Sequence, residues 1–96
     1  MVSLPTFKTH KISKALLSKG FKERKSDHLY FFFYYNEKKT SIRTKLSHGK
    51  SEYDDSLLNF MKKELYLDKG ELERLISCTL SEADYIQILK DKGKIA

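Results

Sequence analysis

The sequence contains one cysteine, Cys78, one proline, Pro5, and no tryptophan. A single cysteine excludes an intramolecular disulfide, and the histidines and cysteine do not have a spacing known for zinc sites. No run of about 18 apolar residues is present, and residues 1–11 lack the apolar segment of a signal peptide. We therefore expect a cytoplasmic protein with no metal or other cofactor and no membrane contact, whose fold depends on packing alone.

Several enzyme motifs are also missing. The sequence has no glycine-rich phosphate loop and no Gly-x-Ser-x-Gly motif, so it gives no support to nucleotide hydrolases or serine esterases. It has no internal repeat and no low-complexity segment. With 96 residues, well below about 150 per domain, the chain is expected to form a single domain over residues 1–96.

Charge is distributed unevenly along the chain. Residues 1–50 contain 12 Lys and Arg against 3 Asp and Glu, a net charge of +9, whereas residues 51–96 contain 7 against 10, a net charge of −3. A basic half on a small domain with pI near 9.4 attracts polyanions, of which nucleic acid is the commonest. A solvated lysine-rich surface explains the charge equally well, so the positions of the cations must decide.

The pattern of apolar residues predicts a helix, three strands and then helices. A short amphipathic helix is expected over residues 8–19, with Thr6 or Thr9 as N-cap and Gly20 at its end. Strands are expected over residues 21–25, 29–35 and 40–46, with a polar turn over 36–39. Asp54 or Asp55 is expected to cap a helix that runs to Leu67.

Two further short helices are expected at the C-terminal end. Asp68 and Glu71 begin the first, and Ser81 with Asp84 has the form of a capping box for the second, which Gly93 ends. The predicted fold class is therefore α+β, in the order α-β-β-β-α-α-α, with a three-stranded antiparallel sheet and helices on one face. The other face of the sheet would then be open.

Alternation along the strands predicts which side chains the open face carries. Leu29, Phe31, Phe33 and Tyr35 would face the core, and His28, Tyr30, Phe32 and Tyr34 the open side. Beside these rings we expect Lys22 and Arg24 from the first strand, and Arg43 and Lys45 from the third. Cations that neutralise phosphates and rings that stack on unpaired bases suit RNA. Alternatively, the rings cover a loop or a protein partner.

Three short motifs occur in the order found in the HicA family of small prokaryotic toxins. They are Lys19-Gly20-Phe21, then Lys25-Ser26-Asp27-His28 before an aromatic strand, then Leu46-Ser47-His48-Gly49 before a capped helix. The chain resembles this family over about residues 8–67, and residues 68–93 form a C-terminal helical extension. The resemblance implies a fold like that of double-stranded-RNA-binding domains, cleavage of messenger RNA and a HicB-like antitoxin as partner. The functional histidine of the family falls on His28.

The chain departs from the family pattern at two places. Ser26-Asp27 replaces Gly-Ser before the first histidine, and Leu46-Ser47 replaces Pro-Arg before the second. A carboxylate at Asp27 would repel a phosphate, unless strand alternation turns it away from the substrate. The resemblance therefore supports the fold more strongly than the activity.

If the chain cleaves RNA without a metal, His28 would take the proton of a ribose 2′-hydroxyl or protonate the leaving oxygen. Lys22, Arg24, Arg43 or Lys45 would stabilise the added negative charge. His28 could equally have a structural or phosphate-binding role. His48 would touch the same face or bond the backbone of its turn, His10 would be solvated, and Cys78 would be a small buried hydrophobe.

Three functions stay open from the sequence. The first is a HicA-like endoribonuclease, the second is a non-catalytic RNA-binding module, and the third is a protein-interaction domain that uses its aromatic face. The sequence does not predict an oligomeric state.

Overall fold

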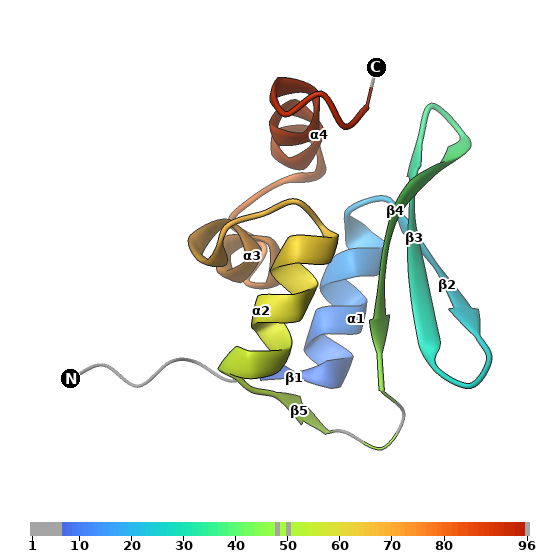
Figure 1. Cartoon of the computed structure of the whole chain (residues 1–96), viewed down its shortest axis with the longest axis vertical. Coiled ribbons are helices and arrows are strands. Elements are labelled where there is room, and N and C mark those ends of the chain that lie inside the picture. Colours follow the sequence, from blue (N-terminus) through green and yellow to red (C-terminus); the bar gives the residue numbers. More distant parts are fainter. Residues whose placement is uncertain (1–6, 48, 50, 96) are drawn as a thin grey trace.

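The computed structural model describes residues 7–47, 49 and 51–95, without the side chain of Asp55. Its elements in chain order are β1 (Phe7–Lys8), α1 (Thr9–Ser18), β2 (Phe21–Lys25), β3 (Leu29–Tyr35), β4 (Lys38–Leu46), β5 (Glu52–Tyr53), α2 (Asp55–Glu64), α3 (Lys69–Ile76) and α4 (Glu82–Asp91). Strands β2, β3 and β4 form an antiparallel sheet in that order, and the helices lie on one side of it (Figure 1). The expected α+β fold class is confirmed.

The hairpin between β3 and β4 is tighter than expected. Its turn has two residues, Asn36 and Glu37, with φ of 52° and 64°, and Tyr35 pairs directly with Lys38. Two consecutive left-handed residues form the turn type whose twist matches that of the flanking strands. Pairing therefore resumes at Lys38, and the predicted turn over 36–39 is wrong by two residues.

A bulge lies in the same hairpin. Phe32 pairs with Arg43, but Tyr34 pairs with Lys39, so β4 contains extra residues between these two pairs. The Thr40 hydroxyl donates to the Phe33 carbonyl at 2.7 Å and accepts from the Ile42 N–H at 3.2 Å. These bonds replace ladder hydrogen bonds that the bulge interrupts.

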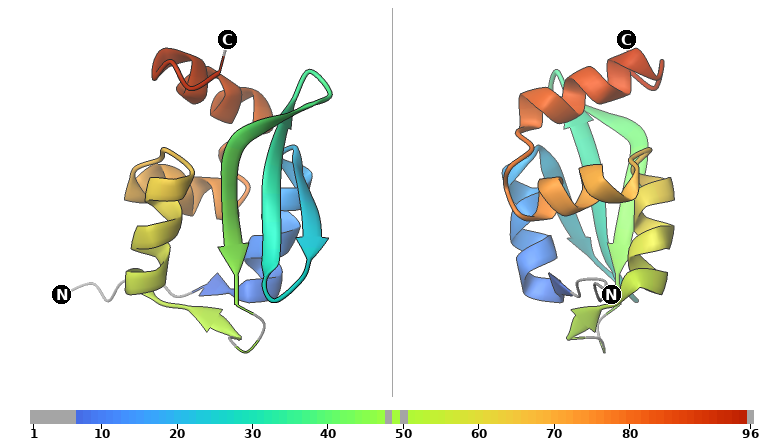
Figure 2. Two further views of the ribbon diagram at one scale, coloured as in Figure 1. Left: turned by 45° about the vertical axis from the view of Figure 1, so that its right-hand side comes forward. Right: turned by 90° about the vertical axis from the view of Figure 1, so that its left-hand side faces the viewer.

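The covered face of the sheet forms the centre of the core. Phe31, Phe33, Ile42 and Leu46 are each at most 1% exposed, and Leu29 and Tyr35 are half-buried against them. The expected alternation of buried and open positions is therefore confirmed. Figure 2 shows α2, α3 and α4 in front of this face in its right-hand view.

Three aromatic rings join the sheet to the last helix. The ring centroids of Phe21 and Phe33 lie 5.1 Å apart, and the Tyr85 ring of α4 lies 5.8 Å and 5.1 Å from them. Tyr85 is fully buried, and its hydroxyl donates to the Leu65 carbonyl at 3.0 Å. Burial raises the pKa of the Tyr85 phenol above its ordinary value.

The backbone conformation at Gly20, close to the start of α4, favours glycine. Gly20 has φ of 94°, and a Cβ atom there would lie 2.7 Å from Oε2 of Glu82. Its position directly after α1 agrees with the predicted helix end, because glycine adopts the left-handed region without steric cost.

The start of α1 differs from the prediction. The helix begins at Thr9, and Lys8 occupies the N-cap position without a side-chain cap. The Thr9 hydroxyl donates instead to the Ser51 carbonyl at 3.3 Å, beside the two-residue pairing of β1 with β5. The prediction of Thr9 as N-cap is wrong because this hydroxyl bonds across the chain, and Thr6 lies outside the described residues.

The caps of the later helices follow the prediction. Asp54 accepts from the Leu57 N–H at 3.1 Å at the start of α2. The predicted capping box between Ser81 and Asp84 is present in α4, and Asp68 with Glu71, predicted to begin α3, also forms a capping box. These bonds satisfy N–H groups that helix geometry leaves unpaired.

Helices α2, α3 and α4 end in the same way. The residue after each C-cap, respectively Tyr66, Cys78 and Gly93, has φ of 61°, 67° and 69°. The next N–H donates to a carbonyl five residues back, the pattern of a Schellman motif. As a result α2 ends at Glu64 and not at Leu67. Cys78 is exposed, so its prediction as a buried hydrophobe is wrong.

None of the helices over the described residues is long and apolar enough to cross a membrane.

Candidate nucleic-acid interface

A row of three aromatic side chains runs along the open face of β3. Tyr30, Phe32 and Tyr34 are half-buried, whereas Phe31 and Phe33 between them are completely buried on the other face. The Tyr30 and Phe32 rings are stacked, with centroids 6.4 Å apart and an angle of 25° between their planes. We call Tyr30, Phe32 and Tyr34 the aromatic row.

Cations from both neighbouring strands flank the row. Tyr30 pairs with Arg24 of β2 and with Lys45 of β4, and Phe32 pairs with Lys22 and Arg43. Directly opposite residues share a face of the sheet. The expected placement of Lys22, Arg24, Tyr30, Tyr34, Arg43 and Lys45 on one face is therefore found.

Two lysines contact the rings of the row. Lys22 Nζ lies 4.4 Å from the Tyr34 ring centroid, and Lys39 Nζ lies 3.9 Å from that of Phe32. Sequence reasoning placed Lys39 in a turn and missed it. The two-residue turn brings Lys39 opposite Tyr34, and its signal in the sequence is the polar pair Asn36-Glu37.

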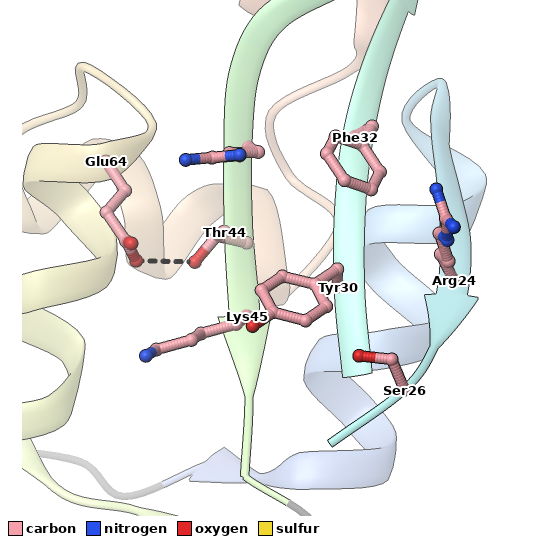
Figure 3. Close-up of a pocket in the computed structure, with 8 residues that line it drawn as sticks. Arg24, Ser26, Tyr30, Phe32, Thr44, Lys45 and Glu64 are labelled. Carbon is pink, nitrogen blue, oxygen red and sulfur yellow. Dashed lines mark hydrogen bonds between the residues drawn. The ribbon is translucent and has the colours of Figure 1, made fainter. Parts of the chain in front are cut away.

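A hollow of about 440 Å³ opens beside the row and reaches α2 (Figure 3). Its lining residues are Arg24, Ser26, Tyr30, Phe32, Arg43, Thr44, Lys45 and Glu64. Thr44 is buried, and its hydroxyl donates to Oε1 of Glu64 at 2.8 Å. Sequence reasoning missed Glu64, because nothing local indicates that the end of α2 reaches the edge of β4.

His28 lies at one end of the aromatic row. It belongs to the bend between β2 and β3, its ring centroid is 6.2 Å from that of Tyr30, and the two rings meet edge to face. Its Nδ1 atom is buried and has no hydrogen-bond partner among the described residues. His28 is not among the residues that line the hollow. The predicted catalytic residue therefore adjoins the row but stands outside the hollow.

The Asp27 carboxylate lies next to the same end of the row. Its Oδ1 accepts from the Ser26 hydroxyl at 2.7 Å, the His28 N–H at 3.1 Å and the Tyr30 hydroxyl at 3.4 Å. The Ser26 hydrogen bond is the main reason that the pKa of Asp27 lies below its ordinary value. Strand alternation does not turn Asp27 away, because it lies in a bend and not in a strand.

The remaining candidate residues lie elsewhere or are not described. His48 lies outside the described residues. His10 and Cys78 are exposed and line a separate groove between α1 and the end of α3. Within residues 7–47, 49 and 51–95, no group of three His, Cys, Asp or Glu side chains is placed to hold a metal ion.

No protein-family model, curated protein or solved structure matches the chain, so the resemblance to the HicA family stays a prediction.

Proposed function

We propose that the open face of the sheet binds RNA, with unpaired bases on the aromatic row and phosphates on the flanking cations. The observation that carries the proposal is the alternation within β3. Half of its rings form the core, and the other half stay at the surface between lysines and arginines of β2 and β4. Aromatic side chains along a basic surface are a common way to bind single strands.

The two lysines that contact the rings fit this proposal. An exposed cation–π contact contributes about 0.5–1 kcal/mol, whereas a base stacked on an aromatic side chain contributes about 1–3 kcal/mol. A base can therefore displace Lys39 from Phe32, and the released ammonium group can pair with a phosphate. The same lysines count against a protein partner, because lysine is depleted from the centres of protein interfaces.

Binding of a labelled 12-nucleotide single-stranded RNA, followed by fluorescence anisotropy in the presence of a chelator, tests the proposal. We expect Tyr30→Ala to weaken binding about tenfold, the loss of one stacked base. Tyr66→Ala is the matched control, because Tyr66 is an exposed ring between α2 and α3 on the helical side. Equal affinity for all three proteins would contradict the proposal.

Cleavage by His28 is a second candidate function, favoured by the contact of its ring with Tyr30. His28 would take the proton of a ribose 2′-hydroxyl as that oxygen attacks the adjacent phosphorus. The bond from phosphorus to the 5′-oxygen breaks, a 2′,3′-cyclic phosphate forms, and the leaving 5′-oxygen takes a proton from water. A nearby cation such as Arg24 would stabilise the added charge. A HicB-like antitoxin as the inhibiting partner is part of this same proposal.

Gel analysis of RNA incubated with wild type and with His28→Ala, both with chelator, tests cleavage. We expect fragments with wild type and intact RNA with the variant. Intact RNA in both lanes, together with binding in the anisotropy measurement, would leave a non-catalytic RNA-binding module.

A further inference from the structure

A negative charge stands at one end of the aromatic row, whose partners on β2 and β4 are lysines and arginines. Asp27 is exposed, and the Tyr30 hydroxyl and the Ser26 hydroxyl both donate to its Oδ1. Ser26 and Tyr30 also line the hollow, where Figure 3 shows them at the same end. Asp27 is therefore fixed at the rim of the ring on which we expect a base to stack.

The chemistry of a carboxylate restricts what Asp27 can contact. An ionised carboxylate only accepts hydrogen bonds, and it repels phosphates. The three donors from Ser26, His28 and Tyr30 all reach Oδ1, which leaves Oδ2 able to accept from a ligand. The group of RNA that suits it is an N–H on the edge of a base, while the phosphates follow the cations of β2 and β4.

The four bases differ in the donors that they present on their Watson–Crick edge. Guanine has two adjacent donors, its N1–H and its 2-amino group. Adenine and cytosine each place one amino group beside a ring nitrogen that is an acceptor, and uracil places one N–H between two carbonyl oxygens. A carboxylate oxygen only accepts hydrogen bonds, so it is attracted to the two adjacent donors of guanine. In adenine, cytosine and uracil it also meets the partial negative charge of the acceptor beside the single donor.

We propose that Asp27 selects guanine for the base that stacks on Tyr30. This inference rests on the proposed RNA binding and adds a sequence preference to it. Ser26 is a positioning residue, because its hydroxyl donates to Oδ1 of the carboxylate at 2.7 Å.

The test uses six-nucleotide RNAs of uridine with one central guanosine, adenosine or inosine, measured by fluorescence anisotropy. Inosine keeps the N1–H of guanine but lacks the 2-amino group. We expect wild type to bind the guanosine RNA about tenfold more tightly than the adenosine RNA, with inosine between them. Asp27→Asn keeps an oxygen for the Ser26, His28 and Tyr30 donors but replaces the second oxygen by an amide, so guanosine should lose its advantage.

Glu37→Gln is the matched control, because Glu37 is an exposed carboxylate in the turn at the other end of β3. It removes the same charge and should keep the preference for guanosine. Thermal unfolding of Asp27→Asn checks that the bend is intact. If wild type binds none of the RNAs, the proposed RNA binding fails. If wild type binds all of them equally, or Asp27→Asn strengthens all equally, RNA binding stands and the selection of guanine is wrong.

Discussion

The two faces of β3 consist of the same types of side chain and have opposite surroundings. Phe31 and Phe33 are fully buried in one cluster with Ile42 and Leu46, and the Phe33 ring packs against the rings of Phe21 and Tyr85. Phe32, one residue away from each, meets Lys22, Arg43 and the ammonium group of Lys39. Aromatic residues in a strand therefore do not by themselves indicate a core. The residues that pair with them on the neighbouring strands distinguish buried rings from surface rings.

Replacement of Phe33 by alanine should have the largest effect on stability. Phe33 is 0% exposed and contacts two other rings, and removal of a buried Phe side chain costs about 3–5 kcal/mol. We expect urea denaturation of Phe33→Ala to show a loss of that size. Phe32→Ala on the open face should lose less than about 1 kcal/mol. A similar loss for both variants would remove the distinction between the faces.

Phe32→Ala should affect ligand binding and leave the fold intact. A base stacked on an aromatic ring contributes about 1–3 kcal/mol, so the affinity for single-stranded RNA should fall about 5- to 150-fold. Anisotropy titration measures this loss. Unchanged affinity for the variant would show that no base stacks on Phe32.

Tyr85 on the covered face should make the unfolding free energy of the protein sensitive to alkaline pH. Its pKa is raised in the folded protein, so the unfolded chain releases the phenol proton at lower pH than the folded chain does. This contribution to stability is complete below the ordinary pKa of 10.0 and is lost as the pH rises above it. Urea denaturation at pH 9 and pH 11 should show a decrease of about 1.4 kcal/mol in wild type that is absent from Tyr85→Phe. An equal decrease in both proteins would assign the effect to other groups.

Arg43→Gln should change the salt dependence of RNA binding more than its sequence preference. Each phosphate contact contributes about 0.7 to the slope of log affinity against log salt for single strands. We expect the slope to fall by about this amount when Arg43 is replaced. Arg74 of α3 is exposed on the helical side and has the same charge, so Arg74→Gln is the control and should leave the slope unchanged.

Cys78→Gly should have the smallest effect, and it should be favourable. Cys78 is exposed and follows the C-cap of α3 with φ of 67°, a conformation that costs about 1–2 kcal/mol for a residue with a Cβ. Part of this gain is offset because glycine loses more entropy on folding. We expect an increase in unfolding free energy below about 1 kcal/mol, with RNA binding unaffected. A decrease would mean that the thiol makes a contact that matters.

Local patterns predicted most of the sheet, and contacts between distant segments account for what was missed. The alternation of β3 and β4 is imposed by burial, so the positions of Tyr30, Tyr34, Arg43 and Lys45 could be predicted from the sequence. The pairing of β1 with β5 involves two residues each, which is too short for a pattern. Glu64 reaches the hollow at the edge of β4 through the end of α2, which no local pattern indicates. Lys39 was missed because β4 begins at Lys38, two residues earlier than expected.

The ring of Tyr85, packed against Phe21 and Phe33, sets a lower limit on the size of any working fragment. A chain shortened to Leu67 would keep every side chain of the open face and still lose the partner that shields two core rings. Strands β2 and β3 would then expose apolar side chains on the covered face of the sheet, and the shortened chain would become prone to association with other chains. A minimal binder derived from this fold must therefore keep α4, although α4 contributes no side chain to the open face described here.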